Sequence, residues 1–237
     1  MTPGWLGAGV SYRRCHHEAL FAAARRPRVL EVIPEHFLAA PGDIEPLADA
    51  FELVFHSVGL SVATAPGGPA RAVLDARLAR VRELVRIARP AWVSDHLALT
   101  VSPDGLDIGH LAPIPYNLDT LQIVVDRVRA WQDALAVPVA LENIAAPFEI
   151  PGALMREPEL LHRLIEATGC HLLLDVTNLL LNGRNFGFDP ATRLAQYPVK
   201  YRNSIPLVFT RVSANGAQEA PRCSWQVIGA GQCGSWA

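Results

Sequence analysis

The sequence predicts an α/β protein with a TIM-type (β/α)8 barrel that is incomplete, with about six to seven strand–helix units. Short apolar runs alternate with amphipathic helical stretches, a pattern that indicates a parallel sheet. The runs are apolar almost throughout, as strands covered on both faces require. A doubly wound open sheet would give a similar pattern. The polar side chains that end several runs favour the barrel, because the strand ends of a barrel open onto one cavity.

The expected elements follow one another in a regular order. The clearest helix spans residues 72–88, where apolar side chains recur every three or four positions and charged ones fill the other face. The stretches 100–116 and 182–190 are rich in Gly, Pro or Asn and are expected to be loops. Seven strands are expected, at residues 7–12, 29–35, 53–61, 91–97, 139–144, 170–177 and 205–212. The other helices are expected at residues 16–25, 118–135, 159–167 and 190–197.

The domain organisation is predicted from size and from the end of the chain. Residues 1–200 are expected to form one metal-binding barrel, since barrels of this size are usually single domains. Residues 201–237 are expected to be a divergent, poorly ordered tail, because residues 213–237 are small, polar and glycine-rich without periodicity. By this reading, the barrel stops one to two units short of eight.

Composition narrows the class of protein. The 237 residues carry a net charge of −2 and no basic run, which argues against a nucleic-acid partner. No apolar run reaches the ~20 residues of a membrane span, and the N-terminus does not resemble a signal peptide. The four cysteines are scattered and show no zinc-type spacing, as in reduced proteins. A cytoplasmic protein without a membrane partner is therefore expected.

Four side chains that can bind metals each follow an apolar run: His56, His96, Glu142 and Asp175. Carboxylates are rarely buried without a partner, and a cation at the strand ends would provide one. Imidazole and carboxylate donors suit iron, manganese or zinc. A network of salt bridges and hydrogen bonds is the alternative. The sequence therefore predicts that these four residues converge on a metal site.

Several neighbouring polar residues could line or support this site. Asn178 lies three residues after Asp175, close enough to line the same cavity, although it could simply end the strand. Asn143 could orient Glu142 from outside the ligand set. Glu35 ends the second predicted strand and could face the cavity. Asp95 would point away from its neighbour His96 on an ideal strand and is expected to be structural.

These residues belong to a series of motifs that resembles one family, the multinuclear non-haem iron-dependent oxidative enzymes. That family includes the iron-containing subunit of methanobactin biosynthesis and was long labelled domain-of-unknown-function family 692. The likeness runs from about Gly7 to Pro190. Its motifs are Leu30–Phe37, Phe55–Ser61, Val93–Leu97, Pro113–Tyr116, Leu141–Asn143, Leu173–Asn178 and Asn185–Pro190.

The resemblance implies a TIM-type barrel that holds two or three iron ions at the C-terminal ends of its strands. It implies oxidative modification of cysteine, or of other residues, in a ribosomally made precursor peptide with dioxygen. A separate peptide-recruiting partner protein is also implied. The matching ligand positions are His56, His96, Glu142, Asp175 and Asn178. Glu142, as the carboxylate between irons, and Asp175 are the expected catalytic residues.

The likeness stops near residue 200. Family members continue with a His-Leu-Ala-Gly-His-like motif, an Asp-x-His pair and a final glutamate, whereas no histidine follows His171 here. We therefore expect a chain that is truncated or divergent at its end, with an activity that this loss impairs. Two alternatives remain: an inactive relative that acts only as a binding protein, and another metal-dependent barrel enzyme such as a sugar isomerase.

Overall fold

The computed structural model describes residues 6–65, 67–198, 207–209 and 225–226. Its main sheet has eight strands in the order β10-β1-β2-β3-β4-β7-β8-β9. All neighbouring strands in it are parallel except β10, which pairs antiparallel with β1. The strands are β1 Gly9–Ser11, β2 Val29–Val32, β3 Glu52–His56, β4 Val93–His96, β7 Val139–Glu142, β8 His171–Asp175, β9 Leu207–Phe209 and β10 Trp225–Gln226.

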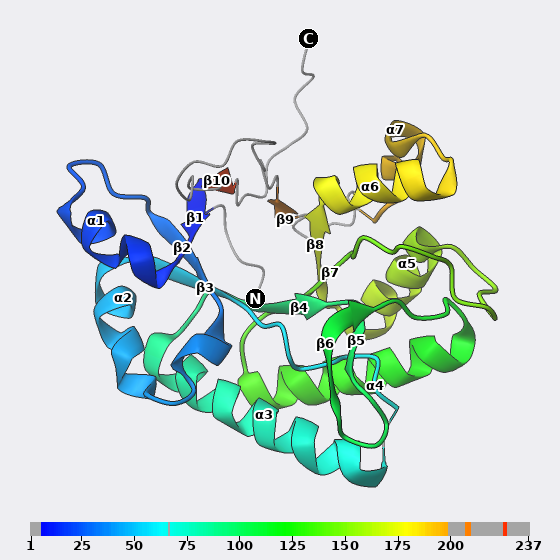
Figure 1. Cartoon of the computed structure of the whole chain (residues 1–237), viewed down its shortest axis with the longest axis horizontal. Coiled ribbons are helices and arrows are strands. Elements are labelled where there is room, and N and C mark those ends of the chain that lie inside the picture. The colour runs from blue at the N-terminus through cyan, green and yellow to red at the C-terminus, as the bar shows by residue number, and fades with distance from the viewer. Residues whose placement is uncertain (1–5, 66, 199–206, 210–224, 227–237) are drawn as a thin grey trace.

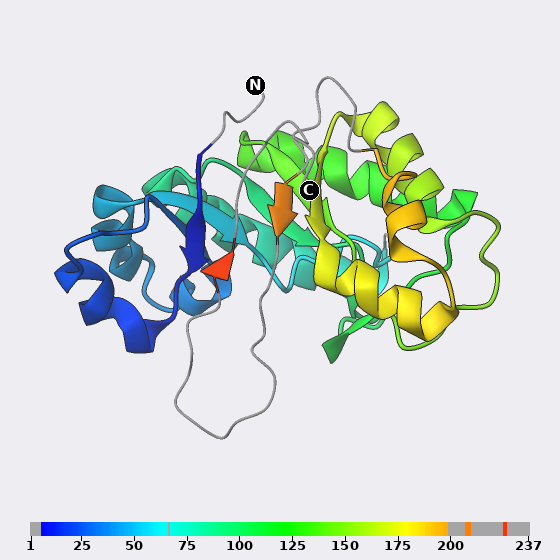
Figure 2. The same ribbon diagram turned by 90° about the horizontal axis from the view of Figure 1, so that it is seen from above.

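The sheet curls, and the helices lie along its outer side (Figures 1 and 2). The longest are α3 (Gly68–Ala88) and α4 (Leu118–Leu135), which pack against each other and follow β3 and β4 in the chain. This arrangement confirms the predicted fold, an incomplete barrel of TIM type. The shorter helices are α1 His17–Ala22, α2 Glu45–Ala50, α5 Glu157–Thr168, α6 Val176–Phe186 and α7 Pro190–Leu194, and three short 3-10 helices span Arg14–His16, Pro34–Phe37 and Pro41–Ile44.

Strand register brings the predicted site residues to one edge of the sheet. His96 of β4 pairs with Glu142 of β7, and His56 of β3 pairs with Ser94 of β4. In parallel strands these positions all lie at the carboxyl ends, on the same side of the barrel. Apolar side chains such as Phe55 and Leu141, both fully buried, anchor the strands in the core beneath this edge. The register therefore positions the site.

The expected loop at residues 100–116 is wrong in part. It contains a β-hairpin, formed by β5 (Leu99–Val101) and β6 (Asp107–Ala112). The signal was the Asp104-Gly105 pair, which is typical of hairpin turns. Gly105 has a φ of +83°, a conformation that favours glycine.

The expected loop at residues 182–190 is also wrong in part, because α6 continues to Phe186. Tertiary hydrogen bonds from its asparagines stabilise a helix that their low propensity would disfavour. The third strand is shorter than expected and ends at His56, while α2 was not predicted at all. Of the predicted strand 205–212, only residues 207–209 are described, and most of the predicted tail lies outside the described residues.

In the part of the chain that the structure describes, no helix has both the length and the apolar character needed to cross a membrane.

Candidate metal centre

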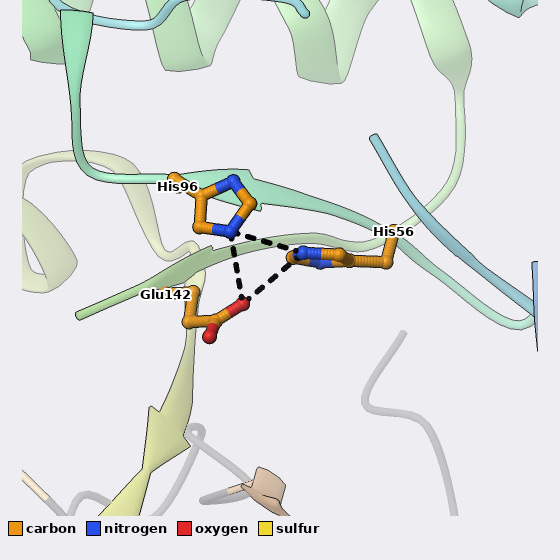
Figure 3. Close-up of side chains that lie close together, drawn as sticks. All are labelled: His56, His96 and Glu142. Carbon is orange, nitrogen blue, oxygen red and sulfur yellow. Dashed lines mark hydrogen bonds and ion pairs between the residues drawn. The ribbon is translucent and has the colours of Figure 1, made fainter. Parts of the chain in front are cut away.

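Three side chains from three adjacent strands converge at the carboxyl edge of the sheet (Figure 3). His56 Nε2 lies 3.2 Å from Glu142 Oε2, and His96 Nε2 lies 3.7 Å from the same oxygen. The two Nε2 atoms are 3.3 Å apart. One ligand atom from each residue thus falls within 4.8 Å of the others, as in a group that could hold a metal ion. The structure therefore brings His56, His96 and Glu142 together as the sequence predicts.

Ser94 fixes the tautomer of His56. The Ser94 hydroxyl donates to the carbonyl of Phe55 over 3.0 Å. It can therefore accept the bond from His56 Nδ1, which is also 3.0 Å away. With the proton on Nδ1, the lone pair of His56 is on Nε2, the atom that faces Glu142. This is how proteins prepare a histidine to bind a metal.

Asp95 lies behind His96. Its carboxylate accepts hydrogen bonds from the backbone N–H groups of Leu60, at 2.8 Å, and of His96, at 2.6 Å. Asp95 Oδ1 is also 3.4 Å from His96 Nδ1. The structural role expected for Asp95 fits these contacts, in which a fully buried carboxylate holds the backbone on two sides of the site.

The second oxygen of Glu142 faces Asn178 of α6. Asn178 Nδ2 lies 3.4 Å from Glu142 Oε1 and donates to the carbonyl of Asn143 at 2.8 Å. Because the amide nitrogen takes both contacts, the Asn178 oxygen points elsewhere. Glu142 thus has one oxygen toward the histidines and one toward α6.

Asp175 is at the N-terminus of α6, where its Oδ1 caps the helix. It accepts from the backbone N–H of Thr177 at 2.6 Å and of Asn178 at 3.0 Å. Asn143 holds the Asp175 backbone through two hydrogen bonds of 3.0 and 2.7 Å. Asp175 lies outside the group of three, so its expected role as a ligand and that of Asn178 stay predictions.

A cavity of about 660 Å³ opens beside the two histidines. His56 and His96 form part of its wall, together with Glu35 from the 3-10 helix after β2 and Arg77 from α3. Glu35 therefore faces the cavity, as the sequence indicates. Burial raises the pKa of the Glu35 carboxyl, and the nearby Asp95 raises it further.

Two groups that support the site were not predicted from the sequence. Ser94 gave no signal, because a serine within a strand has many possible roles. Asn182 of α6 donates to the carbonyl of Ile144 and accepts from the N–H of Ala146, both at 2.8 Å. With Asn178 and Asn185 it falls on one helical face, at spacings of four and three residues. That spacing is the feature of the sequence from which a polar face on this helix could have been predicted.

The comparisons with known proteins bear on these residues directly. A family model described as "RiPP precursor modification enzyme MbnB/TglH/ChrH" matches residues 7–207. The chain belongs to this family. RiPP denotes a ribosomally synthesised and post-translationally modified peptide, so the family acts on precursor peptides. The match spans all the residues predicted to bind metal.

Curated relatives carry the uninformative name "UPF0276 protein". The relative from Caulobacter vibrioides strain NA1000 is 34% identical over 199 residues, which cover 81% of this chain and 69% of the relative. The relative from Streptomyces avermitilis is 38% identical over 213 residues, which cover 84% of this chain and 42% of the relative. The chain thus matches about two thirds of one relative's length and less than half of the other's.

Solved structures with a similar fold include sugar epimerases. A D-psicose 3-epimerase crystallised in the presence of D-fructose has a TM-score of 0.54 at 12% identity, covering 76% of this chain and 66% of its own. A D-allulose 3-epimerase from Methylomonas sp. in complex with D-allulose gives a TM-score of 0.51 at 14% identity, with the same two coverages. At such low identity, the likeness shows the barrel fold alone.

The donors present fit a metal ion. Two imidazole nitrogens and a carboxylate oxygen, all largely buried, suit a divalent metal that accepts nitrogen and oxygen ligands. The lone pair of His56 is already directed inward by Ser94. This donor set is compatible with iron and equally with manganese or zinc.

Proposed function

We propose that this chain takes part in the iron-dependent oxidative modification of cysteine in a ribosomally made precursor peptide. The observation that carries the proposal is the convergence of His56, His96 and Glu142 at the strand ends of a chain in this family. Iron, dioxygen and a separate peptide-recruiting partner protein are parts of the proposal. When bound, iron supplies redox chemistry and a Lewis acid that polarises the substrate.

In this proposal, His56, His96 and Glu142 would hold one iron, with Glu142 contributing Oε2. Ser94 keeps the His56 ring in place and Asp95 holds the His96 backbone, so that less ordering remains when the metal binds. Glu142 Oε1 faces the other way, toward Asn178, with a separation of 3.4 Å from its Nδ2. Glu142 could thus contribute one oxygen to each of two neighbouring ligand sets.

The second part of the proposed site lies at the start of α6. Asp175 Oδ1 is occupied by two backbone N–H groups, which leaves Oδ2 as the oxygen for a second iron. Asn178 donates through its nitrogen to Asn143, which leaves its oxygen as the ligand atom. We propose that these two oxygens and Glu142 Oε1 would be three of the ligand atoms of a second iron.

The cavity beside the histidines is the proposed place for the substrate cysteine. Its volume of about 660 Å³ is in the range of sites that hold a small molecule, which is enough for one or two residues of a peptide. Its walls carry Arg77 and Glu35 beside the two histidines, so a polar peptide backbone would find partners there.

The test uses protein purified without oxygen and loaded with ferrous iron. A cysteine-containing precursor peptide, chosen from an open reading frame beside the gene, is added with dioxygen. We expect oxygen uptake and a mass change confined to the cysteine of that peptide. E142A should abolish both, while E83A on α3, far from the strand ends, should leave both unchanged. Oxygen uptake that is equal in wild type and E142A would contradict the proposal.

A further inference from the structure

The cavity beside His56 and His96 has polar atoms in its wall that the proposed function leaves unused. Glu35 Oε2 and Thr100 Oγ1 are both buried and have no hydrogen-bond partner among the residues described. Both residues line this cavity. Buried polar atoms are nearly always paired in folded proteins. The structure therefore calls for a ligand in the cavity that can hydrogen-bond to this wall.

Glu35 is held by one oxygen only. Ser57 Oγ donates to Glu35 Oε1 at 2.5 Å, and the N–H of Val58 donates to the same atom at 3.1 Å. Ser57 directly follows His56, so these two bonds fix Glu35 relative to the candidate metal centre. Oε1 thus takes both of these hydrogen bonds, and Oε2 is the oxygen that has no hydrogen-bond partner among the described residues.

The surroundings of Glu35 favour its protonated form more than water does. Burial is the largest cause of its raised pKa, and the negative charge of Asp95 adds to it, while the Ser57 bond opposes both. Arg77 on the same wall donates instead to the Gly59 carbonyl, at 2.9 Å, and to Asp107, at 2.8 Å. A carboxylate with a raised pKa is a better proton acceptor near neutral pH.

We propose that Glu35 is a catalytic residue that accepts the proton of the substrate cysteine thiol in this cavity, an inference that rests on the proposed function. The S–H bond breaks, an O–H bond forms at Glu35 Oε2, and the electron pair stays on sulfur, so nothing is oxidised in this step. The step is needed because metals bind the thiolate, whereas a free cysteine thiol, with a pKa of about 8.5, is mostly protonated at neutral pH.

The test counts protons rather than turnover. The full chain is loaded with cobalt(II), and N-acetylcysteine methylamide is added as a thiol probe at neutral pH without oxygen. Binding is followed by the near-ultraviolet band of a cobalt-bound thiolate, and released protons by calorimetry in buffers of different ionisation enthalpy. We expect wild type to release fewer protons per thiol bound than E35Q, which has the same shape but no carboxylate to accept a proton.

Two controls separate proton transfer from a structural effect. The selenium analogue of the probe is already ionised at neutral pH, so wild type and E35Q should release equal numbers of protons on binding it. E157Q removes another buried carboxyl, one that lines a different cavity, and should match wild type with both probes. Bound cobalt and a normal melting temperature in E35Q show that the variant is folded.

The outcomes distinguish this inference from the proposed function. Equal proton release by wild type and E35Q on binding the thiol would overturn the role of Glu35 and leave the metal centre standing. Cobalt binding without a thiolate band in wild type would also overturn it. Failure of wild type to bind cobalt at all would contradict the proposed function, and the role of Glu35 with it.

Discussion

Ser94 determines which nitrogen of His56 faces Glu142. Its hydroxyl has one proton, which it gives to the carbonyl of Phe55, so toward His56 it can only accept. A single small side chain thus sets the tautomer of a proposed ligand. Asp95 holds the backbone of His96 through a hydrogen bond of 2.6 Å to its N–H.

The first prediction concerns Ser94. S94A removes the acceptor for His56 Nδ1, so the ring can turn and its Nε2 loses its fixed direction. We expect the affinity for divalent metal to fall by about 10–100-fold, the usual cost of losing such a supporting group. Competition with a coloured chelator measures this. S102A, in the hairpin turn region, is the control and should bind like wild type; an unchanged affinity in S94A would refute the assignment of the tautomer.

At the scale of elements, α6 is joined to the segment after β7 by a row of asparagines. Asn178, Asn182 and Asn185 bond to the backbone of Asn143, Ile144 and Ala146, each within 2.8 Å. These bonds place the start of α6, with its capping Asp175, beside Glu142. The placement of Asp175 and Asn178 beside Glu142 therefore depends on a helix that the sequence pattern only partly predicted.

The second prediction tests this row. N182A leaves the N–H of Ala146 and the carbonyl of Ile144 without their partner in a buried place. We expect the free energy of unfolding to fall by about 1–3 kcal/mol for each group left unpaired. Urea unfolding measures the loss. N185A removes a single bond in a less buried place and should cost less; equal and negligible effects of the two changes would show that the row does not hold the helix.

The start of α5 carries a second feature of this kind, the buried carboxyl of Glu157. It accepts hydrogen bonds from Tyr116, at 3.1 Å, and from Tyr197. Burial raises its pKa above the ordinary value of 4.5, although both hydrogen bonds oppose the shift. A carboxyl whose pKa is higher in the folded chain stabilises the fold most below its unfolded pKa. That stability is lost as the pH rises through its folded pKa.

The third prediction follows from the direction of this change in stability with pH. As the pH rises from below 4.5 toward 7, wild type should lose stability relative to E157Q, which cannot ionise there. Urea unfolding at a series of pH values measures the difference between the two chains. E159Q changes an exposed glutamate of the same helix, paired with Arg163, and should run parallel to wild type. If E157Q also runs parallel to wild type, the raised pKa is wrong.

At the scale of the whole molecule, the curled parallel sheet explains why residues far apart in sequence meet. His56, His96 and Glu142 end three adjacent strands, and parallel pairing puts these ends at one edge. This part of the site could be predicted because apolar runs that end in a ligand are visible in the sequence.

Other features of the molecule could not be predicted, for physical reasons. The helical state of residues 182–186 depends on asparagine hydrogen bonds to the segment after β7, which is distant in sequence, and local propensity does not contain such contacts. The role of Ser94 depends on the neighbouring strand, and the hairpin at residues 99–112 was indicated only by Asp104-Gly105. Long-range contacts thus decided the features that sequence patterns missed.

The central claim is that His56, His96 and Glu142 hold a metal ion, and the metal content of the protein tests it most directly. Wild type, H56A, H96A and E142A are purified without oxygen from cells supplied with iron, and iron per chain is measured by mass spectrometry. We predict at least one iron per chain in wild type and a large loss in each variant, with folding retained. Wild-type protein without bound metal, or variants that keep the wild-type amount, would contradict the claim.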